Sequence, residues 1–104
     1  MGSDLTHSQR KFLRSSARTR RPDVIIGKGG VNEKTLKHVL AQLARRELVK
    51  IRLLESAGDD RVAAAERIAQ GAGAVLVELV GRIAVLYKPN DQLDAAKRLQ
   101  LPEH

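Results

Sequence analysis

The sequence predicts a compact α/β domain with the element order α-β-α-β-α-β-β. Its clearest signal is a run of three β-branched residues, Val24–Ile26, followed by three glycines within four residues and then by apolar residues of helical period. Helix-like and strand-like segments continue to alternate, and two strand-like runs around Gly81 form the strongest hairpin signal. A chain of 104 residues without cysteine is one domain that can bury a modest core without disulfides or metals.

The first helix is expected to begin at Thr6, because Thr6 and Gln9 have the spacing of a capping box. It should end near Arg18 or Arg20, since Pro22 cannot continue it. One side of this helix is apolar and available to a core: Leu5, Phe12, Leu13 and Ala17.

The other side of this helix carries positive charge. Asp4 is the only acidic residue before Asp23, so no partner at helical spacing balances the charge. A solvated helix face is the alternative interpretation. We expect these uncompensated cations to bind a polyanion: Arg10, Lys11, Arg14 and Arg18 in the helix, and Arg20 and Arg21 in the connector after it.

A glycine turn joins the first strand to a second helix, expected over residues 33–47 with Asn32 as its N-cap. Such a turn presents backbone N–H groups and the positive end of a helix dipole with few side chains in front of them, which suits a phosphate. A tight connection alone is the alternative. The residues expected to form this anion-binding loop are Gly27, Lys28, Gly29 and Gly30.

The second helix extends this candidate site. Lys34 and Lys37 lie in its first turns, where cations oppose the helix dipole, and this placement makes sense if an anion is bound. An ordinary polar helix face is the alternative. His38 is expected to be a surface residue, because no cysteine or ordered set of carboxylates accompanies it.

Two common nucleotide-binding motifs are absent from the glycine turn. The pattern G-x-x-x-x-G-K-[ST] fails because Gly29 follows Lys28, and G-x-G-x-x-G lacks its third glycine. What remains is a G-x-x-G loop, which clamps the nucleic-acid backbone in one class of RNA-binding modules.

Asp59 and Asp60 are explained by helix capping, so neither an enzyme activity nor a metal or other cofactor is expected.

The later elements complete the sheet. We expect a strand over residues 48–54, a helix over 61–70 closed by Gly71 and Gly73, strands over 74–80 and 82–88, and a short helix or frayed tail over 91–100. Because crossovers between parallel strands are right-handed, the second and third helices should share one face of the sheet. The first helix must pack elsewhere.

The net charge of +7 is concentrated in the first half of the chain. Residues 1–52 hold 13 Lys and Arg against four Asp and Glu, whereas residues 53–104 hold six against eight. This asymmetry favours a polyanion-binding half. With one Phe, one Tyr and no Trp, stacking on unpaired bases can add little, so recognition of backbone and shape is expected.

No apolar run is long enough to predict a membrane span.

Several separated motifs resemble the CRM domain family, whose bacterial stand-alone members are the YhbY-like proteins. The resemblance covers positions 5 to 89 in the family's order. The matching residues are Leu5 and Thr6, Gln9 to Arg14, Ile26 to Val31, Glu47 to Arg52, Leu79 to Ile83 and Leu86 to Pro89, with Lys88 where an arginine is expected.

This resemblance implies a four-stranded mixed sheet of order 1-2-4-3, as in the C-terminal domain of a bacterial translation initiation factor. It also implies RNA binding through the G-x-x-G loop and the basic helices. The RNA would be large-subunit ribosomal RNA or its precursor, and the process ribosome assembly, with ribosomal proteins as further partners. Residues 5–89 would form the RNA-binding domain and residues 90–104 an extension.

We expect a cytoplasmic monomer. A protein-interaction module that docks on ribosomal proteins or another acidic partner is the alternative function. Phosphate contacts alone do not distinguish RNA from DNA.

Overall fold

A computed structural model describes residues 5–58 and 60–103 and contains the predicted elements in the predicted order, together with two short 3-10 helices. The capping expected of Asp59 lies outside the described residues. The elements are α1 (His7–Arg18), β1 (Val24–Ile26), α2 (Glu33–Arg46), β2 (Leu48–Leu53), η1 (Glu55–Ala57), α3 (Arg61–Ala72), β3 (Val75–Val80), β4 (Ile83–Tyr87) and η2 (Ala95–Lys97).

The four strands form one mixed sheet of order β1-β2-β4-β3, which confirms the order that the family resemblance implied. β1 runs parallel to β2, and β4 lies antiparallel between β2 and β3. Parallel strands need a long crossover connection, and α2 supplies it between β1 and β2.

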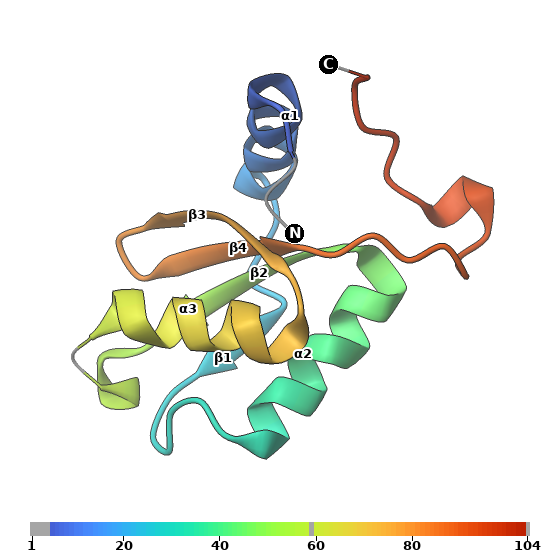
Figure 1. The fold of residues 1–104 in the computed structure, drawn as a ribbon. Coiled ribbons are helices and arrows are strands. Elements are labelled where there is room, and N and C mark those ends of the chain that lie inside the picture. Colours follow the sequence, from blue (N-terminus) through green and yellow to red (C-terminus); the bar gives the residue numbers. More distant parts are fainter. Residues whose placement is uncertain (1–4, 59, 104) are drawn as a thin grey trace.

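Helices cover both faces of this sheet (Figure 1). On one face α2 and α3 enclose the larger core, to which Ile51 and Ile68 belong. On the other face α1 places Leu13 in a smaller core with Leu48 and Tyr87. The prediction that the second and third helices share a face while the first packs elsewhere is therefore confirmed.

Side-chain caps fix the starts of the first two helices. The Gln9 N–H donates to Thr6 Oγ1 at 3.1 Å and the Thr6 N–H donates to Gln9 Oε1 at 3.0 Å, which confirms the predicted capping box. Asn32 is confirmed as the N-cap of α2, and it forms a similar reciprocal pair with Thr35, at 3.0 and 2.9 Å. Both helices thus begin at positions that the local sequence specifies.

The prediction that Gly71 helps to close the third helix is wrong. The helix continues past Gln70 to Ala72, and Gly73, with φ of +65°, is its C-cap. At Gly71 the helix packs closely on α2, because a Cβ there would lie 2.9 Å from the methyl carbons of Leu36. This glycine therefore serves helix packing and not helix termination.

The segment after β4 packs against the rest of the fold, although the sequence predicted a short helix or a frayed tail. In the described part of this segment, residues 88–103, only Ala95–Lys97 is helical. The chain then returns to α1 (Figure 1), where Leu99 and Leu101 contact the smaller core. Gln9 Nε2 donates to the carbonyl oxygen of Pro102 at 2.8 Å, so the segment contacts the first turn of α1.

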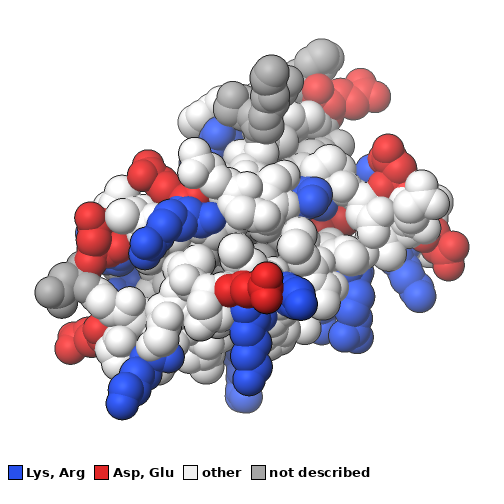
Figure 2. Space-filling view, turned by 60° about the horizontal axis from the view of Figure 1, so that its bottom comes forward, with Lys and Arg blue, Asp and Glu red and all other residues white. Residues whose placement is uncertain are grey.

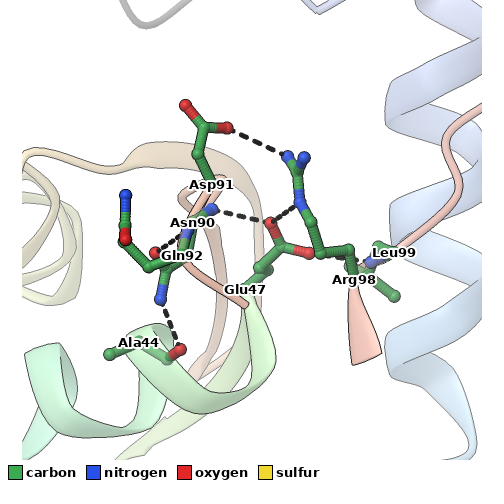
Figure 3. Close-up of polar contacts among 7 residues, drawn as sticks. All are labelled: Ala44, Glu47, Asn90, Asp91, Gln92, Arg98 and Leu99. Atoms are coloured by element: carbon green, nitrogen blue, oxygen red, sulfur yellow. Dashed lines mark hydrogen bonds and ion pairs between the residues drawn. The ribbon is translucent and has the colours of Figure 1, made fainter. Parts of the chain in front are cut away.

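Glu47, at the end of α2, anchors this segment (Figure 3). It is fully buried, and its φ is +64°. Its carboxylate accepts hydrogen bonds from the N–H groups of Asn90 and Leu99, both at 2.7 Å, and from Nε of Arg98 at 3.3 Å. Asn90 Nδ2 also donates to the carbonyl of Ala44 at 2.7 Å, so Asn90 binds both the carboxylate of Glu47 and the backbone of α2. The buried charge is thus compensated by donors from the segment that it holds.

Replacing Glu47 with alanine is expected to lower the free energy of unfolding by about 3 kcal/mol, because two backbone donors and a guanidinium lose their buried acceptor. Urea denaturation followed by circular dichroism measures this loss. Glu66→Ala, at an exposed position of α3, is the matched control and should stay within about 0.5 kcal/mol of the unsubstituted protein. Equal stabilities of the two variants would contradict the anchoring role of Glu47.

Candidate nucleic-acid interface

Residues 27–30 form a tight turn between β1 and the cap of α2. The Gly30 N–H donates to the carbonyl of Gly27 at 2.9 Å, and the φ angles of Gly29 and Gly30 are +98° and +61°. Side-chain-bearing residues rarely adopt such angles. Lys28 and Gly29 are exposed. The tip of the turn therefore offers open backbone and a single charged side chain to the solvent.

The inner side of the turn packs closely on the segment that follows β2. A Cβ on Gly27 would lie 3.3 Å from both Cδ1 of Leu54 and Oγ of Ser56. A Cβ on Gly30 would lie 3.2 Å from the carbonyl oxygen of Ala57. The two outer glycines of the G-x-x-G pattern therefore allow two backbone segments to approach each other, in addition to allowing the turn.

Arg82 holds this supporting segment from the turn of the β3–β4 hairpin. Its Nε donates to the carbonyl of Leu53 at 2.8 Å, and its Nη2 donates to the carbonyls of Leu54 and Gly58 at 3.3 and 3.1 Å. The charge pattern of the sequence did not identify Arg82 as a site residue. Arg82 was included only in the range Leu79 to Ile83, which matches the family. No periodicity or spacing marks a side chain that acts through carbonyls of a distant segment.

Two lysines of α2, Lys34 and Lys37, continue the charge that Lys28 supplies in the turn, and all three are exposed. The amides of Glu33 and Lys34 belong to the first turn of α2, where N–H groups have no intrahelical acceptor. Figure 2 views the molecule from the side of α2 and α3, and Lys and Arg side chains project along the lower edge of that view. The turn and the start of α2 thus combine positive charge with exposed donors.

Part of the positive charge predicted for α1 and its connector is used within the fold. The partners of Arg10 and Arg14 belong to β3, which helical spacing cannot reveal, whereas the partner of Arg20 is Asp23, three residues later. The contacts are Arg10 with the carbonyls of Leu76 and Val77 at 3.4 and 3.3 Å, Arg14 with Glu78 at 3.8 Å, and Arg20 with Asp23 at 2.7 Å.

The expectation of uncompensated charge is therefore wrong for Arg14 and Arg20, which have acidic partners, whereas Arg10 donates to carbonyls. Lys11, Arg18 and Arg21 are exposed, as expected. Because α1 and α2 lie on opposite faces of the sheet (Figure 1), their cations do not form one flat surface.

The part of the chain that the structure describes contains neither a candidate metal site nor a membrane-spanning helix. Within residues 5–58 and 60–103, no group of three or more His, Cys, Asp or Glu side chains could hold a metal ion, and His38 is exposed. Burial raises the pKa of the Tyr87 phenol, with a smaller contribution from Glu47, but Tyr87 lies at the opposite end of β4 from Arg82. In the same ranges no helix is long and apolar enough to cross a bilayer.

Gly30→Ala and Gly81→Ala form a matched pair, because both glycines have φ near +60°, whereas a Cβ on Gly81 would meet no heavy atom within 4 Å. Both substitutions should cost about 1–2 kcal/mol for the left-handed backbone. Gly30→Ala should cost about 1 kcal/mol more, because Ala57 must shift. Thermal unfolding of the two variants measures the difference. A loss for Gly30→Ala no larger than that for Gly81→Ala would argue against close packing beneath the turn.

The chain is similar to known proteins. The chain matches the family model described as CRS1 / YhbY (CRM) domain over residues 5–88. It is 37% identical over 98 residues to the "Probable RNA-binding protein YqeI" of Bacillus subtilis, which covers 94% of this chain and 99% of that protein. It is 34% identical over 89 residues to the "Probable RNA-binding protein MJ0652" of Methanocaldococcus jannaschii, which covers 84% of this chain and 66% of that protein.

A solved structure agrees with these matches. The solution structure of SAV1595 from Staphylococcus aureus superposes with a TM-score of 0.74 at 34% sequence identity, covering 94% of this chain and 99% of that chain. The family match includes the glycine turn, the supporting segment and all four strands. This chain therefore belongs to the CRS1 / YhbY (CRM) domain family.

Proposed function

We propose that this chain is a non-enzymatic RNA-binding protein that holds the sugar–phosphate backbone at the glycine turn and the start of α2. The observation that carries the proposal is the turn itself, whose exposed tip is supported from beneath by close packing on the segment after β2. A phosphate at this place would meet backbone donors, the positive end of the α2 dipole and nearby lysines. The names of the relatives, which describe RNA-binding proteins, support RNA as the polyanion.

Each predicted contact residue has its own part in this proposal. Gly27, Lys28, Gly29 and Gly30 form the phosphate-binding loop, and Lys34 and Lys37 extend it along α2. Lys11, Arg18 and Arg21 enlarge the footprint on the other side of the sheet, whereas Arg10, Arg14 and Arg20 stabilise the position of α1 and its connector.

The proposed target is large-subunit ribosomal RNA or its precursor in the cytoplasm, and the proposed process is assembly of the large ribosomal subunit. This part rests on the family resemblance. Residues 5–89 supply the contacts in this proposal, and residues 90–103 support the domain through Glu47 and the smaller core.

Lys28→Gln is expected to lower affinity for a structured ribosomal RNA fragment about fivefold near 0.15 M salt, and to reduce the slope of log K against log salt by about 0.9, because one phosphate contact is lost. Filter binding between about 50 and 200 mM salt measures both quantities. Arg67→Gln, at an exposed position of α3, is the matched control and should change neither. An affinity of the unsubstituted protein that does not fall with rising salt would overturn the proposal.

Crosslinking in cells, followed by sequencing of the recovered RNA, should enrich large-subunit ribosomal RNA or its precursor. Lys28→Gln should reduce the yield without changing the position of the crosslinks, because phosphate contacts carry little sequence information. Recovery dominated by other RNA would contradict the ribosomal assignment. Association with ribosomal proteins that survives complete nuclease digestion would instead favour a protein-docking module.

A further inference from the structure

One row of the sheet is left uncovered on the face that carries α1. Strand register aligns Ile25, Arg52, Ile83 and Val80 across β1, β2, β4 and β3 in that order. Residues that pair in register point to the same face. The exposed fractions of Ile25 and Val80 are 59% and 62%, although their strand neighbours Val24 and Leu79 contribute to the larger core. Across four strands the sheet thus presents an aliphatic row interrupted by one arginine.

The packing of α1 explains why this row is open. The helix packs on β2, β3 and β4, and its buried residues Leu13 and Ala17 contact the part of the sheet around Leu48 and Val85. The open row follows at Arg52 and Ile83, two residues further along β2 than the pair of Lys50 and Val85. A hollow of about 250 Å³ remains there, with Arg18 and Ala17 of the helix on one side and Val80 and Ile83 on the other.

Two cations and one carboxylate line this hollow, namely Arg18, Lys50 and Glu78. Arg18 is exposed, and so is Arg52, which pairs in register with the lining residue Ile83. The ammonium group of Lys50, however, donates to the carbonyls of Ala17 and Arg20 at 3.0 and 2.7 Å. The nearby carboxylate of Glu78 has Arg14 within 3.8 Å, which offsets its charge. An anionic partner is therefore favoured here over a cationic one.

The row also adjoins the glycine turn. Ile25 is three residues before Lys28, so their Cα atoms are at most about 11 Å apart. Arg52 pairs with Ile25 across one strand spacing, about 4.8 Å. The row thus extends from Ile25, next to the glycine turn, to Val80 and Ile83, which line the hollow together with Arg18.

We propose that this row and its hollow form a second RNA-contact surface, which takes unpaired nucleotides that extend from the glycine turn. The aliphatic side chains contact base and sugar faces, Arg18 holds a phosphate at the hollow, and Arg52 holds a phosphate within the row. The proposal rests on the proposed function, and it joins Arg18 of α1 to the turn along one path.

An acidic peptide fits this surface less well than RNA. A peptide gains affinity from a sheet mainly through main-chain hydrogen bonds at a free strand edge. The row crosses the face of the sheet, where the strand amides are already paired with each other. A flexible polyanion with apolar base faces can use aliphatic side chains and arginines without such hydrogen bonds.

Methyl and amide NMR spectra of the full chain can separate these possibilities. A short oligouridylate should shift the methyl signals of Ile25, Ile83 and Val80 together with the amide signals of Gly29 and Gly30. An RNA duplex should shift mainly the glycine amides, because its bases are not free to contact the row. Polyglutamate at equal charge concentration should leave the methyl signals in place.

Two exposed positions allow a mutational test with little risk to the fold. Arg52→Gln should lower affinity for oligouridylate about fourfold near 0.15 M salt and reduce the salt slope by about 0.7. Val80→Thr should lower affinity by about fourfold through the loss of apolar contact. The matched controls are Val62→Thr, where the side chain is 48% exposed on α3, and Arg67→Gln, and neither should alter binding.

The outcomes distinguish this proposal from the one on which it rests. Shifts of the glycine amides without shifts of the three methyl groups, or equal affinities of Val80→Thr and Val62→Thr, would overturn the second surface and leave the loop intact. Methyl shifts of equal size with polyglutamate would overturn it in favour of an acidic protein partner. RNA that shifts neither set of signals would contradict the proposed function itself.

Discussion

The parallel pairing of β1 with β2 is the constraint on which the candidate interface depends. β1 has only three residues, yet its register places Ile26 beside Leu53, and the Leu54 N–H donates to the Ile26 carbonyl at 2.8 Å. The carboxyl ends of parallel strands lie at the same edge of a sheet, so the segments that leave them run side by side. The glycine turn consequently rests against a second backbone segment, and its shape does not depend on its own hydrogen bond alone.

Arginine and lysine have different positions around this edge. The guanidinium groups of Arg10 and Arg82 each donate to more than one backbone carbonyl of the sheet or its connections. A planar group with several donors suits such bridging. At the outer tip and in the first turns of α2 the exposed cations are Lys28, Lys34 and Lys37. These compact charges on flexible stems can follow a phosphate chain without being tied to one geometry.

The sequence was sufficient for features whose signals are local. The order of elements, the cap at Thr6 and the turn over residues 27–30 could be predicted, because capping, periodicity and glycine content act over a few neighbouring residues. Features that depend on distant segments could not. Gly71 is a typical helix terminator in sequence but packs on Leu36, and the role of Glu47 appears only when the returning segment supplies its donors. The open row of the sheet was equally hidden, since the position of α1 leaves it uncovered.

The contact between Arg10 and β3 has a consequence for how copies of this protein behave together. Strands at the margins of a sheet can recruit strands from other molecules, which leads to aggregation. Here β1 offers only three residues, and β3 is interrupted by a bulge between Leu76 and Glu78, beside which Arg10 already occupies the carbonyls of Leu76 and Val77. For a strand of another molecule, β1 is a short edge, and two carbonyls of β3 already accept hydrogen bonds from Arg10. These features oppose intermolecular pairing with the sheet, which contains the apolar strands β3 and β4.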